Sequence, residues 1–193
     1  MTTEIIIVFI ASYLSGSLPF GLILTKIFLN KDLRKIGSKN IGATNVLRTG
    51  NKTIAALTLF LDILKGIIPL LITKEYLTDL IYLSSLAAFL GHIFPVWLRF
   101  KGGKGVATYL GIIFILSFNL GVIFSVSWIL ISIASKYSSL SSILSTMVVF
   151  IVSFFNNNFE LTSYLFITFI IILYTHRQNI VRIKNKSEDK IKL

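Results

Sequence analysis

Six long apolar stretches limit what this chain can fold into more than any other feature of its sequence. They cover residues 5–29, 54–72, 80–98, 106–133, 140–155 and 161–174. A helix that crosses the hydrocarbon core of a bilayer needs roughly 20 predominantly apolar residues. Hydrophobic residues make up 54% of the chain and charged residues only 14%, which is more apolar surface than a soluble domain of 193 residues can bury. The sequence therefore predicts an all-α integral membrane protein.

The basic residues between these stretches predict the orientation of the chain. The loop 31–52 has six basic residues and one acidic residue, which places it in the cytoplasm by the positive-inside rule. The N-terminus is then outside, but a single crossing by 106–133 would leave the basic tail 177–192 outside as well. Splitting that stretch at Asn119 returns the tail to the cytoplasm. We therefore predict seven transmembrane helices, with the N-terminus outside and the C-terminus cytoplasmic.

The composition also excludes several kinds of chemistry. A net charge of +11 would suggest a nucleic-acid partner in a soluble protein, but these charges lie between apolar segments, so we predict no such partner. The absence of cysteine rules out disulfides, Cys-ligated metals and a thioester on the protein. Two histidines are too few for a His-rich metal centre, and we predict no metal and no cofactor. Without a repeat of 20–50 residues, we predict one multi-spanning domain over residues 1–193.

Two ionisable residues interrupt the second apolar stretch. Asp62 and Lys65 are spaced i, i+3 near its middle, where an unpaired charge costs several kcal/mol. We expect them to pair with each other, either as a purely structural pair or near a substrate. Lys26 lies near the inner end of the first helix and can reach the interface by snorkelling.

The first of three unusual loop segments is 37–48, which is rich in small and hydrogen-bonding residues. Small residues let an anion approach the backbone, and hydroxyl, amide and guanidinium groups can bind it. A plain polar linker would not need so many such residues close together. The candidate binding residues are Gly37, Ser38, Asn40, Thr44, Asn45 and Arg48.

The second segment combines 91–95 with a glycine run that leads directly into the fourth apolar stretch. Backbone N–H groups of a glycine run at a helix N-terminus, with lysines beside them, suit a phosphate. It is not a Walker A loop, because Leu98 stands where that motif needs glycine and Gly105 where it needs Ser or Thr. The candidate residues are His92, Lys101, Gly102, Gly103, Lys104 and Gly105.

The third segment follows the last apolar stretch. If the helix continues past the membrane, His176, Asn179 and Arg182 share about one face at spacings of three, and Glu188 follows. A lone histidine at a membrane exit is usually only an interfacial residue. Its two polar companions make His176 a candidate for binding or catalysis.

All three segments resemble one family, the bacterial membrane acyl-phosphate:glycerol-3-phosphate acyltransferases (the PlsY family). The resemblance covers residues 15–188 and includes a weaker fourth match at 137–143, which contains Ser142. The sequence departs from the family at three positions. Lys39 and Lys186 stand where glycine is usual, and Lys136 stands where arginine is common.

The resemblance implies transfer of a fatty acyl group from acyl-phosphate to the 1-hydroxyl of sn-glycerol 3-phosphate, which forms lysophosphatidic acid and phosphate. It implies a multi-pass protein of the bacterial plasma membrane with its active site at the cytoplasmic side. A soluble phosphotransacylase that forms acyl-phosphate is a further implied partner. A phosphate oxygen of the donor would accept the hydroxyl proton. The chain itself has no His-x4-Asp dyad, because Trp97 and Val181 stand at that offset from its two histidines.

Residue roles follow from the same resemblance. The implied catalytic residues are Lys104 and Arg48 for phosphate charge, Ser38 and Asn179 for hydrogen bonding, and His176 for positioning phosphate or hydroxyl. The loop 102–105 would hold phosphate through backbone N–H groups. The remaining implied substrate-binding residues are Gly37, Asn40, Thr44, Asn45, His92, Lys101, Ser142, Arg182 and Glu188.

The alternative hypothesis is a small membrane transporter of organophosphate anions, which would also need basic residues and glycine-broken helices. Such features lie near the middle of the membrane on repeated halves of a transporter. Here they cluster in predicted cytoplasmic loops and no repeat is visible, which favours the enzyme.

Overall fold

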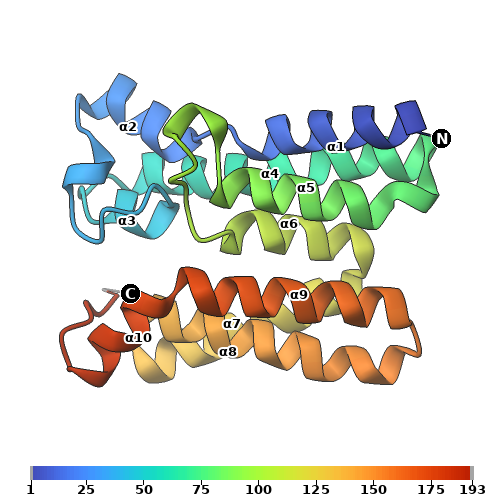
Figure 1. The fold of residues 1–193 in the computed structure, drawn as a ribbon. Coiled ribbons are helices and arrows are strands. Elements are labelled where there is room, and N and C mark those ends of the chain that lie inside the picture. Colours follow the sequence, from blue (N-terminus) through green and yellow to red (C-terminus); the bar gives the residue numbers. More distant parts are fainter. Residues whose placement is uncertain (1, 192–193) are drawn as a thin grey trace. The chain divides into compact units, whose positions relative to one another are not determined.

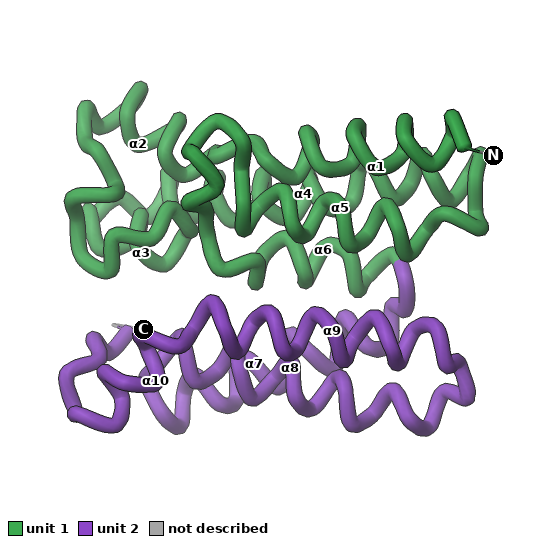
Figure 2. Tube along the Cα trace, viewed as in Figure 1, with its two compact units in different colours: residues 1–115 green, residues 116–193 purple. Residues whose placement is uncertain are grey.

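All regular structure is helical over residues 2–191, the part of the chain that the computed structural model describes (Figure 1). The chain divides into two compact units, residues 1–115 and 116–193 (Figure 2). The sequence prediction of an all-helical protein is confirmed.

Unit 1 is built around the long helix α4. Its helices are α1 (Thr2–Gly16), α2 (Phe20–Leu29), α3 (Ala43–Leu47), α4 (Lys52–Tyr76), α5 (Ile81–Ile93) and α6 (Val106–Leu116), the last ending at the unit boundary. Helices α1, α4 and α5 pack against one another, and α2 and α3 pack on α4. Short 3-10 turns precede or link them at Leu33–Lys35, Thr78–Leu80 and Val96–Leu98.

Unit 2 is a smaller helical unit. Its helices are α7 (Phe118–Ser135), α8 (Ser138–Ser153), α9 (Phe159–Thr175) and α10 (Arg177–Lys184), with a 3-10 turn at Phe154–Asn156. Helix α8 packs against both α7 and α9, and the short α10 contacts α8 and α9.

Small residues allow the helices of unit 1 to approach closely. A Cβ atom added at Gly16, Gly91 or Gly111 would collide with backbone atoms of α5, α1 or α4, respectively. Ser12 on α1 and Ser84 on α5 form a buried hydrogen bond of 2.8 Å. Because lipid is as apolar as a leucine side chain, helices in a membrane associate through such close packing and polar contacts.

Within residues 2–191, five helical segments are long and apolar enough to cross a bilayer: Thr2–Leu29, Lys52–Tyr76, Thr78–Leu98, Phe118–Ser135 and Ser138–Asn156. A sixth is obtained if α9 and α10, which are bent by 56°, are counted as one span. Helix α6 has 11 residues, which at 1.5 Å per residue is about half the thickness of a bilayer core.

The sequence analysis treated the first apolar stretch as one helix, and this is wrong. Helix α1 ends at Gly16 and α2 begins at Phe20, although the two together still form one candidate span. Pro19 explains the break, because proline has no N–H and disfavours helical conformation in the residue before it.

The two later breaks differ in how well the sequence predicted them. The stretch 106–133 is divided as expected, but at Ser117, whose backbone is extended, two residues before Asn119. The expectation of a helix continuing through His176 is wrong, because α9 ends at Thr175 and α10 leaves at an angle of 56°. His176 therefore lies at a bend, with Asn179 one turn into the next helix.

Candidate active site

The loop between α2 and α4 is organised around the side chain of Asn45, which is 1% exposed. The two N–H groups of its Nδ2 are shared among the carbonyl oxygens of Leu33, Ile36 and Asn40, which lie 3.1, 3.0 and 2.7 Å from Nδ2. Its Oδ1 accepts the backbone N–H of Ser38 at 3.1 Å. Both ends of the amide are thus engaged with the loop backbone. The geometry favours a supporting role for Asn45 over direct substrate binding.

Arg48 lies over this loop, immediately after α3. Gly37 has a left-handed φ of 49°, and a Cβ added there would lie 2.9 Å from Cδ of Arg48. Arg48 is exposed and Ser38 is half-buried, so both can reach an anion from solution. The structure therefore brings Gly37, Ser38 and Arg48 together as the sequence predicted.

Other polar residues of the loop differ in their availability. Arg34 donates from Nε and Nη2 to the Asp32 carboxylate at 2.9 and 2.8 Å. These hydrogen bonds lower the pKa of Asp32 to about 2, so the pair stays charged and Arg34 is already engaged. Thr44 is exposed on the first turn of α3, and Asn40 is half-buried with its carbonyl bound by Asn45.

The glycine run packs tightly against His92, near the end of α5. The N–H of Gly103 donates to the His92 carbonyl, and the N–H of Gly102 donates to the Ile93 carbonyl, both at 3.0 Å. A Cβ on Gly103 would collide with Nε2 of His92. These two N–H groups are occupied within the loop, contrary to the expectation that they hold phosphate. Glycine is required at position 103 because the backbone passes directly beside an imidazole ring.

Lys104 stands between two buried glycines, just before α6. Gly105 has a φ of 88°, and a Cβ there would collide with the Phe89 ring. With its neighbours packed in this way, the backbone of Lys104 has little freedom, while its side chain is half-buried and Lys101 is exposed. The arrangement suits a lysine that must hold its ammonium group in a defined place.

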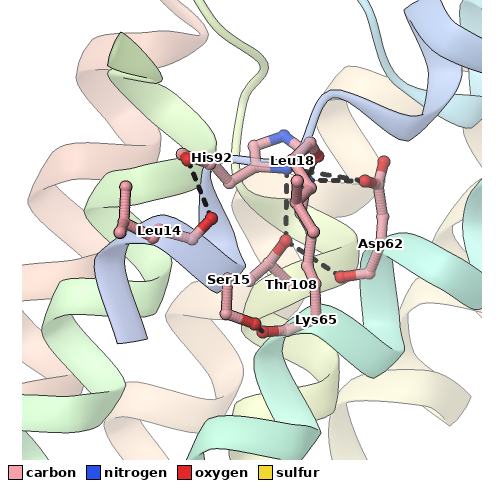
Figure 3. Close-up of polar contacts among 8 residues, drawn as sticks. Leu14, Ser15, Leu18, Asp62, Lys65, His92 and Thr108 are labelled. Atoms are coloured by element: carbon pink, nitrogen blue, oxygen red, sulfur yellow. Dashed lines mark hydrogen bonds and ion pairs between the residues drawn. The ribbon is translucent and has the colours of Figure 1, made fainter. Parts of the chain in front are cut away.

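A buried polar network lies behind His92 in the same unit (Figure 3). Nζ of Lys65 is 2.7 Å from Oδ1 of Asp62, and these side chains are 2% and 3% exposed. The same Nζ donates to the Leu18 carbonyl at 2.7 Å. The Thr108 hydroxyl donates to the Asp62 carbonyl at 3.0 Å and is 3.2 Å from Nδ1 of His92. The expected pairing of the two charges is confirmed, and it connects to a predicted site residue.

In unit 2, the carboxylate of Glu188 accepts hydrogen bonds from polar residues of the third segment. Its Oε1 accepts hydrogen bonds from Ser139 Oγ at 2.8 Å and Asn179 Nδ2 at 2.6 Å, and its Oε2 accepts from Arg182 Nε at 2.7 Å. Burial alone would raise the pKa of Glu188, but the hydrogen bonds from Arg182, Asn179 and Ser139 outweigh it and lower the pKa. A carboxylate only accepts, so the amide of Asn179 is oriented with its NH₂ group toward Glu188.

His176 is 2% exposed and is held at the bend between α9 and α10. Its Nδ1 lies 2.8 Å from the Ile172 carbonyl, which can only accept. Nδ1 therefore carries a proton, and in the neutral ring the lone pair is on Nε2. Nε2 is then the acceptor nitrogen of the neutral ring.

The fourth segment contains one predicted residue and one that the sequence analysis missed. Ser142 donates to the Ser138 carbonyl and accepts from Trp128 Nε1, so it is engaged between α7 and α8. Ser139, three residues earlier, binds Glu188 instead. Only the run of serines in the segment hinted at Ser139, because its partner lies 49 residues away.

A comparison with protein families adds to this geometry. The family model described as glycerol-3-phosphate acyltransferase matches residues 6–186. The chain belongs to this family. The acyltransferase predicted from the sequence is therefore confirmed, and the transporter hypothesis is set aside.

Individual glycerol-3-phosphate acyltransferases are similar to the chain over its full length. The one from Pelagibacter ubique (strain HTCC1062) is 54% identical over 192 residues, which cover 98% of this chain and 99% of that protein. The one from Mesorhizobium japonicum (strain LMG 29417 / CECT 9101 / MAFF 303099) is 46% identical over 191 residues, 99% and 98% of the two chains.

Solved structures of the family agree with the fold. A crystal structure of PlsY, an integral membrane glycerol 3-phosphate acyltransferase, in its glycerol 3-phosphate form is 37% identical with a TM-score of 0.92. Its lysophosphatidic acid form is 36% identical with a TM-score of 0.89. Each covers 98% of this chain and 96% of the solved chain. This acyltransferase is thus an integral, multi-pass membrane protein, as predicted.

Two lysines of this acyltransferase have a left-handed backbone conformation. Lys39 and Lys186, for which the resemblance implies glycine, have φ angles of 60° and 56°. An L-residue in this left-handed region costs roughly 1–2 kcal/mol, whereas glycine adopts it freely. The chain therefore keeps a conformation suited to glycine while carrying a lysine at both positions.

Replacing Lys186 by glycine should raise stability, because it relieves the left-handed strain next to Glu188. We expect a net gain of about 0.5–1 kcal/mol, or a few degrees in Tm, once the greater chain entropy of glycine is subtracted. Lys184→Gly is the matched control, since Lys184 lies in α10 and glycine there should cost about 1 kcal/mol. Thermal unfolding of the purified protein in detergent measures both. Equal destabilisation by the two substitutions would show that position 186 is not strained.

Proposed function

We propose that this enzyme transfers a fatty acyl group from acyl-phosphate to the 1-hydroxyl of sn-glycerol 3-phosphate. The products are 1-acyl-sn-glycerol 3-phosphate, which is lysophosphatidic acid, and inorganic phosphate. The observation that carries the proposal is the similarity along nearly the whole chain to PlsY in its glycerol 3-phosphate and lysophosphatidic acid forms. These two molecules are the acyl acceptor and the acylated product of one reaction.

The chemistry needs no covalent intermediate on the protein. The hydroxyl oxygen of glycerol 3-phosphate attacks the acyl carbonyl carbon, and the bond from that carbon to the phosphate oxygen breaks. The hydroxyl proton leaves with the departing phosphate. Acyl-phosphate is a mixed anhydride and is already activated, and the chain has no cysteine with which to form a thioester. The work of the protein is then to position two anions and to balance their charge.

Arg48 and Lys104 are the residues that we assign to phosphate charge. Arg48 lies over the loop that Asn45 holds in shape, with Ser38 beside it as a hydrogen-bonding group. Lys104 follows a glycine run that is fixed against His92. The other predicted residues of these loops, Gly37, Asn40, Thr44, Lys101, Gly102, Gly103 and Gly105, would shape the binding loops.

His176 and Asn179 are the residues that we assign to the acceptor hydroxyl and to phosphate. The proton on Nδ1 leaves Nε2 of a neutral His176 as an acceptor for the hydroxyl. Asn179 is oriented by Glu188, which Arg182 also binds. Glu188, Arg182 and Ser142 would therefore support this part of the site through their contacts with other side chains.

We further propose seven membrane crossings, with the N-terminus outside and the C-terminus cytoplasmic. The distribution of basic residues and the break at Ser117 support this count, in which α6 is a short crossing. The active site would then be at the cytoplasmic side of a bacterial plasma membrane. The family match from residue 6 to 186 supports one acyltransferase domain, and a soluble phosphotransacylase would supply the acyl-phosphate.

The donor is tested by phosphate release from acyl-phosphate with the purified protein. Release should depend on glycerol 3-phosphate and yield lysophosphatidic acid in equal amount. Because the chain has neither a cysteine nor a His-x4-Asp dyad, palmitoyl-CoA should not replace acyl-phosphate. Efficient direct turnover of palmitoyl-CoA would refute the proposed donor.

Removing the Lys104 ammonium should abolish most activity. We expect Lys104→Ala to lower kcat/KM by about 10²–10³-fold, as when one preorganised charge-stabilising group is lost. Lys104→Arg should recover little, because a planar guanidinium does not occupy the place of a compact ammonium. Lys26→Ala is the control, since Lys26 is an exposed lysine near the end of α2 and should keep wild-type activity. Full activity of Lys104→Ala would remove Lys104 from the mechanism.

The topology is tested with reporters fused along the chain. Reporters after Lys136 and after Leu193 should be cytoplasmic, because both positions follow inward crossings in the seven-helix arrangement. A reporter at Asn157 should be external. An external position for Lys136 would contradict this arrangement.

A further inference from the structure

The buried pair of Asp62 and Lys65 has more partners than a stabilising pair within one helix would need. Taking two charges out of water costs several kcal/mol for each ion, so a buried pair is by itself weak support for stability. This pair contacts three segments outside α4: the break after α1, the end of α5 and the start of α6. Its position between those segments calls for a separate explanation.

Lys65 connects the pair to the break in the first span. Its ammonium donates to the Leu18 carbonyl at 2.7 Å, which lies between Gly16 and Phe20, the ends of α1 and α2 (Figure 3). It also lies 5.8 Å from the centre of the Phe20 ring, within cation–π range. The Ser15 hydroxyl donates back to the Lys65 carbonyl at 3.0 Å. Lys65 therefore holds both sides of the break onto α4.

Asp62 and Thr108 connect the pair to His92. The single hydroxyl proton of Thr108 is donated to the Asp62 carbonyl. Nδ1 of His92, 3.2 Å from that hydroxyl oxygen, must then be the donor of the second hydrogen bond. The Asp62 carboxylate, 3.9 Å from Nδ1, favours a proton at the same place. These contacts determine both the tautomer and the orientation of the ring.

His92 in turn supports the glycine run. Its Nε2 edge lies where a Cβ of Gly103 would be, and its carbonyl accepts the Gly103 N–H. A ring rotated about its Cα–Cβ bond would no longer leave the same space for residue 103. The path of the backbone into Lys104 and α6 thus depends on the orientation of His92.

We propose that Asp62, Lys65 and Thr108 are positioning residues of the acyltransferase, which act through His92 to hold the glycine run and Lys104 in the binding conformation. The proposal rests on the phosphate-binding role assigned above to Lys104. None of the three residues touches substrate in this scheme. They set the conformation of a loop that does.

Thr108→Val tests the connection to His92, because valine keeps the shape of threonine and removes the hydroxyl. We expect the KM for at least one phosphate substrate to rise about tenfold, while kcat changes less. Thr108→Ser keeps the hydroxyl and should restore KM to within about twofold. Thr73→Val is the matched control, since the Thr73 hydroxyl is buried on α4 and donates to the Pro69 carbonyl of its own helix. A purely structural role would reduce the amount of active enzyme and leave KM unchanged.

The charged pair is tested by replacing both members with apolar residues. Asp62→Leu combined with Lys65→Met removes the cost of burying charge, so the variant should unfold near the wild-type Tm. Its KM should still rise about tenfold, because Leu18 and His92 lose their partners. If a purely structural pair were replaced in this way, stability and KM would both be preserved.

Limited trypsin cleavage after Lys101 and Lys104 provides a measurement that does not depend on activity. Thr108→Val should be cleaved there several-fold faster than wild type or Thr73→Val. If wild type releases no phosphate from acyl-phosphate but Thr108→Val is still cleaved faster, the proposed reaction is rejected and the positioning role is retained. A wild-type KM in either folded variant, or unchanged cleavage in Thr108→Val, would overturn the positioning proposal.

Discussion

Backbone polar groups have no water to bind inside a bilayer, so every interruption of a membrane helix must find partners within the protein. This chain interrupts its helices after Gly16, at Ser117 and at His176. At the first break the Lys65 ammonium binds the Leu18 carbonyl, and at the third Nδ1 of His176 binds the Ile172 carbonyl. Two of the breaks are thus satisfied by side chains of ionisable residues. Burying an ionisable side chain in a membrane costs free energy unless it has a hydrogen-bond partner. Lys65 and His176 must therefore stay where they meet these carbonyl oxygens.

Two carboxylates organise the polar parts of the two units in different ways. Asp62 is buried, paired with one lysine and surrounded by helices. Glu188 lies after the last helix, where three hydrogen bonds outweigh its burial and lower its pKa. The stability that it provides is present above the ordinary glutamate pKa and is lost as the pH falls through that lowered pKa. Both carboxylates hold neighbouring residues of the candidate site in place, Asp62 beside His92 and Glu188 beside Asn179 and Arg182.

Glycine has a more specific role here than access for phosphate. Gly103 is required because His92 occupies the space of its side chain, and the N–H groups of Gly102 and Gly103 are already bound. Binding of phosphate by this segment would then depend chiefly on the ammonium of Lys104. At Gly37, by contrast, the left-handed backbone and the Arg48 side chain lie together on an accessible loop. Glycine thus allows close packing in both loops, against the His92 ring at Gly103 and against Asn45 and Arg48 at Gly37.

The sequence alone predicted the helical membrane class, the pairing of Asp62 with Lys65 and the three polar loops. Each of these follows from a pattern of neighbouring residues: the length of the apolar stretches, the i, i+3 spacing of two charges and the placement of basic residues. The bend at His176 and the break before Phe20 were missed, since the length of an apolar stretch does not show whether the helix stays straight, and Pro19 was the only local signal of the first break. Contacts such as Thr108 with Asp62, Ser139 with Glu188 and Gly103 with His92 join residues 46, 49 and 11 positions apart. Only the packing of helices in space decides them, because no local pattern specifies which distant side chain will meet a given hydrogen-bonding group.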